Sequence, residues 1–175
     1  MRKAILNAAQ TAKNIDKLKS SVYDPKTFPL VLKEVLPSDF EQIHAYYADV
    51  RSLRKEYDVQ KEADQTLVNY RLDEICDPTK SESQRDKELH DFVHGDSDSL
   101  LTDMGRKIIS LTDSIHKYGQ GMQKGNRVQK AAAPGVLYLA QVLRNNEDET
   151  LQQIRLFDEM DAQNRRLSQG LDDYF

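Results

Sequence analysis

A short charged string at residues 85–90 (RDKELH) holds the residue types best suited to chemistry, and Phe92 follows it. Arginine presents a planar fork of N–H donors to phosphate oxygens. Histidine titrates near neutral pH and can transfer a proton. On a helix, side chains four or five positions apart stay within reach of a common point. Arg85, Asp86 and His90 are therefore the candidate catalytic residues for chemistry at a phosphate group.

This string resembles the signature of the HEPN superfamily, whose members are all-helical. The signature is an arginine, a polar residue, three variable positions and a histidine, often with an aromatic residue two positions later. Arg85, Asp86, His90 and Phe92 occupy those positions. The resemblance implies metal-independent RNA cleavage, in which His90 acts on the ribose 2′-hydroxyl or the leaving oxygen. It also implies that Arg85 stabilises the scissile phosphate, that Asp86 orients the pair, and that two copies face each other in a homodimer. The match is confined to residues 85–92 of a chain of 175 residues.

Two other interpretations of the same residues remain open. Arg85 and His90 could be exposed, ion-paired residues on the solvated face of a short helix. Alternatively, His90 and His94 could join His44 in a metal site, because His44 follows Glu41 in an E-x-x-H pair. Such a pair supplies two ligands from one helical turn in metal-binding bundles, but a full site needs two pairs and further glutamates. We predict no metal and no cofactor, with His44, His90 and His94 as the candidate ligands to check.

The overall composition narrows the class of protein. The net charge of −4 argues against a protein that coats DNA or RNA, whose affinity comes largely from neutralising phosphates. The single cysteine, Cys76, excludes an internal disulfide and suits a reducing compartment. No stretch approaches the roughly 20 apolar residues that a membrane span requires. We therefore expect a cytoplasmic protein without a membrane span, and leave open secretion as a bacterial effector.

The spacing of apolar residues predicts an all-α fold, an elongated up-down helical bundle with two long helices and coiled-coil-like packing. One long helix is expected over about 40–76, with Ser38 and Glu41 as a capping box at its start and Pro78 after its end. The apolar stripe weakens at residues 58–65, so this segment is one helix or two. A single helix of that length must project as a hairpin or pair with an equally long partner.

The same apolar spacing and the same helix-end signals predict the remaining helices. We expect a short helix over 83–94, a turn at 95–98 with Asp98 as N-cap, and a helix from Leu101 that ends before Gly119. Residues 119–126 are expected to form a glycine-rich connector. Pro134 suits the start of a last helix, which has no glycine or proline between 136 and 169. The prediction is one helical domain over 1–175, with a projecting hairpin at about 40–76.

These long amphipathic stretches predict a non-catalytic module that binds another protein or a second copy of itself. RNA is a partner only under the ribonuclease hypothesis. The side chains predicted to form the interaction face share the apolar spacing of two helices. They are Ile43, Tyr47, Val50, Leu53, Tyr57, Leu101, Met104, Ile108, Leu111 and Ile115.

Overall fold

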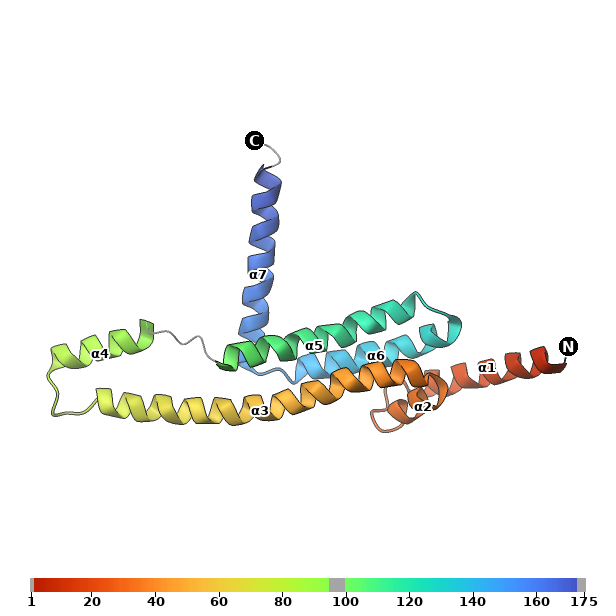
Figure 1. Cartoon of the computed structure of the whole chain (residues 1–175), viewed down its shortest axis with the longest axis horizontal. Coiled ribbons are helices and arrows are strands. Elements are labelled where there is room, and N and C mark those ends of the chain that lie inside the picture. The colour runs from red at the N-terminus through yellow and green to blue at the C-terminus, as the bar shows by residue number, and fades with distance from the viewer. Residues whose placement is uncertain (1, 95–99, 173–175) are drawn as a thin grey trace.

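The computed structural model describes residues 2–94 and 100–172, with the side chains of 93–94 and 171–172 left out. The described residues are all-α and form a helical bundle with seven helices (Figure 1). Their bounds are α1 Arg2–Ser21, α2 Phe28–Val35, α3 Pro37–Ile75, α4 Glu82–His94, α5 Leu100–Gln123, α6 Arg127–Asn145 and α7 Glu149–Asp172. The predicted turn at 95–98, including Asp98, lies outside the described residues.

Helix α3 runs without a break for 39 residues, or about 58 Å at 1.5 Å per residue. The weak segment at 58–65 stays helical because it holds no glycine or proline and is bridged by side chains one turn apart. Arg54 pairs with Asp58 at 3.0 Å, and Gln60 donates to Asp64 at 2.8 Å. The sequence left one or two helices open here, and the structure shows one.

Three predicted helix boundaries are wrong. Helix α3 begins at Pro37 with Leu36 as an uncapped N-cap residue, so Ser38 and Glu41 lie inside it and form no capping box. Helix α5 continues through Gly119, because a glycine there lets α6 come close: a Cβ atom would lie 2.9 Å from Leu137 Cδ2. Pro134 lies inside α6, which begins after Asn126 instead.

The true boundaries are set by polar side chains. Asn126 and Gln129 form a capping box at the start of α6, each accepting a hydrogen bond from the backbone amide of the other (2.9 and 3.1 Å). Between α6 and α7 the chain breaks at residues 146–148. There the Asp148 carboxylate accepts from the Leu151 amide at 2.9 Å and caps α7. The predicted single last helix is therefore two helices.

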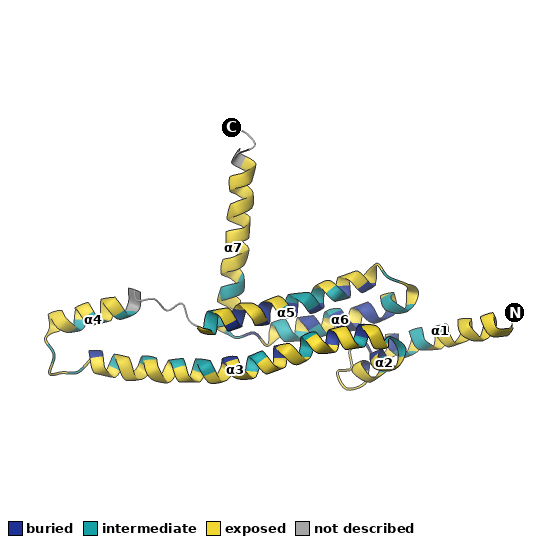
Figure 2. Cartoon of the chain, viewed as in Figure 1, coloured by how far each residue is buried: buried dark blue, intermediate teal, exposed yellow. Residues whose placement is uncertain are grey.

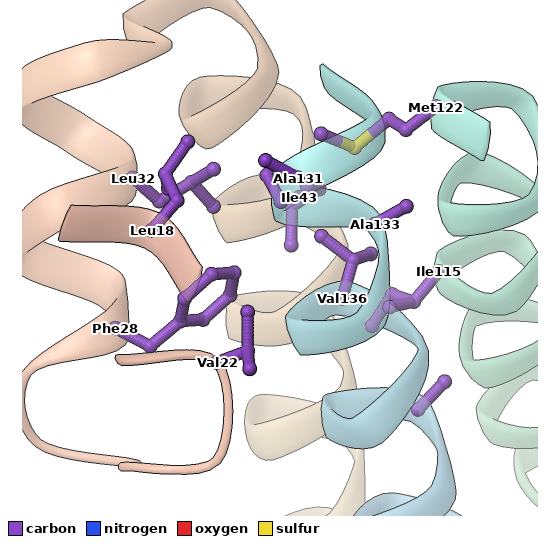
Figure 3. Close-up of a cluster of buried hydrophobic side chains, with 12 residues drawn as sticks. Leu18, Val22, Phe28, Leu32, Ile43, Ile115, Met122, Ala131, Ala133 and Val136 are labelled. Atoms are coloured by element: carbon purple, nitrogen blue, oxygen red, sulfur yellow. The ribbon is translucent and has the colours of Figure 1, made fainter. Parts of the chain in front are cut away.

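The core is built around α5, which packs against both α3 and α6. The first cluster joins α1, α2, α3, α5 and α6, with Leu18, Ile115 and Val136 fully buried at its centre (Figure 3). The second cluster joins α3, α5 and the base of α7, around Tyr57 and Leu151. Beyond these clusters the helices extend into solvent.

Three segments project from this body (Figures 1 and 2). They are the first half of α1, the α3–α4 arm (residues 58–94, in which α4 folds back beside the end of α3), and α7 beyond its base. A Lys80–Glu88 ion pair of 2.7 Å braces the turn of the arm. None of the described helices combines the length and apolarity needed to cross a membrane.

Candidate functional site

An apolar groove of about 630 Å³ lies between α3 and α6, and α2 closes one end of it. Helices α3 and α6 each present side chains at positions i, i+3, i+4 and i+7 to the groove, which is one face of a helix. From α3 these residues are His44, Tyr47, Ala48, Arg51, Ser52 and Lys55. From α6 they are Gly135, Tyr138, Leu139 and Val142. The groove therefore has two roughly parallel helical walls.

The groove exists because the bundle lacks a helix. Helix α5 packs extensively on α3 and on α6, whereas α3 and α6 make little direct contact with each other. In a four-helix bundle a fourth helix would fill the space opposite α5. Here α2 fills only one end of that space, where Phe28 and Leu32 are buried. The remainder of the space that a fourth helix would fill is open, and it forms the groove.

The end of the groove at α2 is tightly packed. Gly135 of α6 faces the ring of Phe28, and a Cβ atom at position 135 would lie 2.3 Å from Phe28 Cζ. The groove therefore begins where Phe28 stops, and it opens along α3 from Tyr47 towards Lys55.

The rim along α3 is basic. Arg51 and Lys55 are exposed, and neither forms an ion pair with a residue in the described part of the chain. Arg51 lies over the ring of Tyr47 at 5.9 Å, which holds the guanidinium above the apolar floor. The opposite rim, from α6, is uncharged. The acid at the α2 end, Asp24, accepts hydrogen bonds from its own loop, chiefly from Thr27, and these lower its pKa.

A partly buried polar network joins α3, α5 and α6, the helices around the groove. The Tyr118 hydroxyl of α5 donates to the Asp39 carboxylate of α3 at 2.6 Å. Gln129 of α6 also reaches Asp39, at 3.4 Å. Burial, together with the hydrogen bond to Asp39, raises the pKa of Tyr118 to about 12. The phenol is therefore neutral at physiological pH, and it links the helices that carry the groove.

A second network anchors α3 to α7. The Tyr57 hydroxyl donates to both Asp148 oxygens at 3.1 and 3.0 Å, and Lys61 lies 2.7 Å from the same carboxylate. Burial, followed by this hydrogen bond, raises the pKa of Tyr57 to about 12. Burial alone would raise the pKa of Asp148, but hydrogen bonds from Lys61, the Leu151 amide and Tyr57 lower it overall.

The predicted catalytic residues lie on α4, in the arm. Arg85 is half-buried, and its Nε atom is enclosed without a hydrogen-bond partner among the described residues. Asp86 is exposed, and the His90 side chain is 70% exposed beside Asp91. None of the three lines the groove described above. The ribonuclease hypothesis stays a prediction.

The predicted metal ligands are spread along the molecule. His44 lies near the start of α3, and its ring stacks on Phe40 with centroids 5.2 Å apart. His90 lies on α4, which packs beside the far end of α3. The side chain of His94 is outside the described part. Among the residues that are described, no three His, Cys, Asp or Glu side chains gather as a metal ion would require.

The predicted interaction face lies mostly inside the chain. All ten side chains named above for that face lie in or against the two core clusters, because the apolar faces of α3 and α5 cover each other. Val50, Tyr57 and Ile115, for example, are buried. These residues therefore pack the helices of the chain against one another, and a role for them in binding a partner stays a prediction. Of the ten, Ile43 and Tyr47 also line the groove.

Sequence reasoning missed most of the groove. Its walls come from residues 22–32, 40–55 and 135–142, and no local motif connects these segments. One signal was present: in the first half of α3, Ala48 widens the apolar face that Ile43, Tyr47 and Val50 form. A helix with a wide apolar face can contact more than one neighbour.

Comparisons with protein-family models, curated proteins and solved structures gave no match to this chain. Its function is therefore inferred from its own geometry.

Proposed function

We propose that this protein is a non-catalytic interaction module that binds an amphipathic, acidic helix of a partner protein in the groove between α3 and α6. The observation that carries the proposal is the vacant fourth position of the bundle, which is lined by apolar residues and has a basic rim. Binding a helix in an apolar groove is a common mode of peptide recognition.

The exposed surface supports an interaction role. The chain exposes 12807 Å². A compact monomer of 20.1 kDa is expected to expose about 8,700 Å². The difference is larger than the area buried in a standard protein–protein interface, about 1,600 Å².

The chemistry of the partner follows from the groove. Its floor, with Tyr47, Leu139 and Val142, suits apolar side chains repeating every three to four residues. The positive charges of Arg51 and Lys55 can pair with glutamate or aspartate on one flank of the partner helix. These charges steer and select the partner more than they add affinity.

The test uses two short helical peptides with the same leucine stripe, one flanked by glutamates and the other by lysines. We expect the glutamate peptide to bind the full chain more tightly, as measured by fluorescence anisotropy. The double variant Arg51→Glu, Lys55→Glu should weaken that binding by roughly threefold to thirtyfold, as expected for two exposed ion pairs, and should favour the lysine peptide.

The matched control is Lys107→Glu, Lys124→Glu, which makes the same charge change at exposed residues of α5 and of the turn after it, away from the groove. This control should retain the preference for the glutamate peptide. Equal binding of both peptides, or equal weakening by both double variants, would reject the groove as the docking site.

The ribonuclease alternative is separated by a different experiment. If the protein is non-catalytic, varied RNAs incubated with the wild type and a chelator should be cut no faster than with Arg85→Ala or His90→Ala. Cleavage that both substitutions abolish, in folded protein, would overturn the proposal.

A further inference from the structure

Four charged side chains of α3 form one row that starts at the rim of the groove and runs past its open end. Arg51, Lys55, Asp58 and Glu62 follow one another at intervals of four, three and four residues. That spacing keeps them on one face of a helix, within about 60° of one another. Arg51 and Lys55 line the groove, whereas Asp58 and Glu62 lie beyond it. The charge along the row therefore changes sign where the groove ends.

Helix α3 carries this row beyond the end of α6 (Figure 1). Helix α6 ends at Asn145, and the backbone oxygen of Asn146 accepts a hydrogen bond from Arg54 at 3.0 Å. The last turn of α6 is thus level with Arg54. Beyond that level α3 is the only wall, and the acidic half of the row continues along it.

The acidic half of the row faces solvent. Asp58 is 58% exposed, although it pairs with Arg54 at 3.0 Å, and Glu62 is exposed. Tyr57 and Lys61 contact the turn before α7. Each of them precedes a member of the row by one position, which places it about 100° away around the helix. The turn before α7 therefore leaves this face of α3 accessible.

The closed end of the groove determines where a long bound helix must extend. Phe28 of α2 packs against Gly135 and blocks that end. The open part of the groove, from Tyr47 to Lys55, corresponds to about 12 Å of helix at 1.5 Å per residue. A helix of common length, about 10–14 residues, measures about 15–21 Å. Such a helix emerges beside Lys55 and lies along the acidic half of the row.

We propose that the helix bound in the groove continues along α3 with a flank of two opposite charges. Its residues beside Arg51 and Lys55 are acidic, and its residues beside Asp58 and Glu62 are basic. This inference rests on the proposed function and specifies the charge order of the partner helix. A helix with acidic residues along its whole flank would meet like charges beyond the groove, which oppose its binding.

The test compares long helical peptides of about six turns that share one leucine stripe and one half with a glutamate flank. The flank of the other half carries lysines in the mixed peptide and glutamates in the acidic peptide. The mixed peptide is made in both orders, with its glutamates at the amino or the carboxyl end, so that both directions of binding are sampled. In one order it should bind the full chain roughly threefold to thirtyfold more tightly than the acidic peptide, as measured by fluorescence anisotropy.

Glu62→Lys reverses a charge in the outer half of the row and should abolish this preference for the mixed peptide. The matched control is Glu56→Lys, which makes the same charge change at an exposed residue of α3, about 120° around the helix from Glu62. This control should retain the preference.

Equal binding of the mixed and acidic peptides, or equal effects of the two substitutions, would overturn the extended docking surface. The short peptides described above distinguish that failure from a failure of the groove. If the short glutamate peptide still binds more tightly than the short lysine peptide, the groove is retained and only its extension along α3 is rejected.

Discussion

At the scale of residues, close approaches and buried hydroxyls hold the site together. Gly135 admits the ring of Phe28 at the closed end of the groove. Tyr118 of α5 donates to Asp39 of α3, and Tyr57 of α3 donates to Asp148 in the connection before α7. These contacts are few, so single substitutions should have measurable effects.

Gly135→Ala should lower the free energy of unfolding by about 1–3 kcal/mol, the usual cost of overpacking a core. The added Cβ would lie 2.3 Å from Phe28 Cζ, so the ring must move. Urea denaturation measures the change. Gly121→Ala is the control, because nothing lies within 4 Å of its added Cβ, and it should leave stability unchanged or slightly raised. Equal stability of the two variants would contradict this packing.

Tyr57 and Tyr118, whose hydroxyls donate to carboxylates, predict a loss of stability in alkali. Their folded pKa of about 12 lies above the ordinary value of 10.0. The folded chain therefore keeps protons that the unfolded chain has lost, and this stability is present below pH 10 and lost as the pH rises towards 12. Tyr57→Phe, Tyr118→Phe should show a shallower decline of the urea midpoint over that interval. Parallel declines in both proteins would refute the assignment.

At the scale of elements, α7 is oriented by ion pairs of unequal burial. Glu147 is 7% exposed and pairs with Arg155. Arg106 pairs with Asp158 at 3.5 Å, with both side chains about half exposed. A buried carboxylate that loses its partner is strongly destabilising, whereas an exposed pair contributes little.

Arg155→Ala should therefore cost about 3 kcal/mol and release the base of α7, because it leaves the Glu147 carboxylate buried without its partner. Arg106→Ala should cost less than about 1 kcal/mol. For each variant, urea denaturation measures the loss of stability, and hydrogen exchange of the first turns of α7 measures whether its base is released. A similar small effect of the two substitutions would mean that the Arg155–Glu147 pair does not hold the base of α7.

Sequence reasoning found the helices better than their ends. Apolar spacing predicted α3 and α5, and the lack of glycine and proline before Pro78 also predicted α3, because these signals are local. Gly119 and Pro134 were misread as boundaries because packing of α5 on α6 outweighs their local preferences. The groove could not be predicted, since it depends on which helix is missing from the bundle. The candidate catalytic string at Arg85–His90 was visible in sequence, but its role is still a prediction.

At the scale of the whole molecule, a small body carries three projecting segments (Figure 1). The body holds both core clusters, and the α3–α4 arm and α7 extend from it. Much of the chain is therefore surface, which suits the interaction role that we propose.

This shape predicts a large radius of gyration. A compact domain of 175 residues would have about 16 Å. Small-angle scattering of the full chain, extrapolated to zero concentration, should give a clearly larger value. A value near 16 Å would mean that α7 or the arm folds onto the body.

The packing of α3 against α5 also affects how the chain folds while it is being synthesised. The core face of α3 ends at Tyr57, and the face that covers it begins at Met104. At a synthesis rate of about 5–20 residues per second, the ribosome exposes the first face for roughly 2–10 s before the second is made. We expect ribosomes stalled before α5 to carry nascent chains that bind chaperones, and stalling after α6 to release them, as crosslinking would show. The pace of translation then sets how long the nascent chain exposes this apolar face.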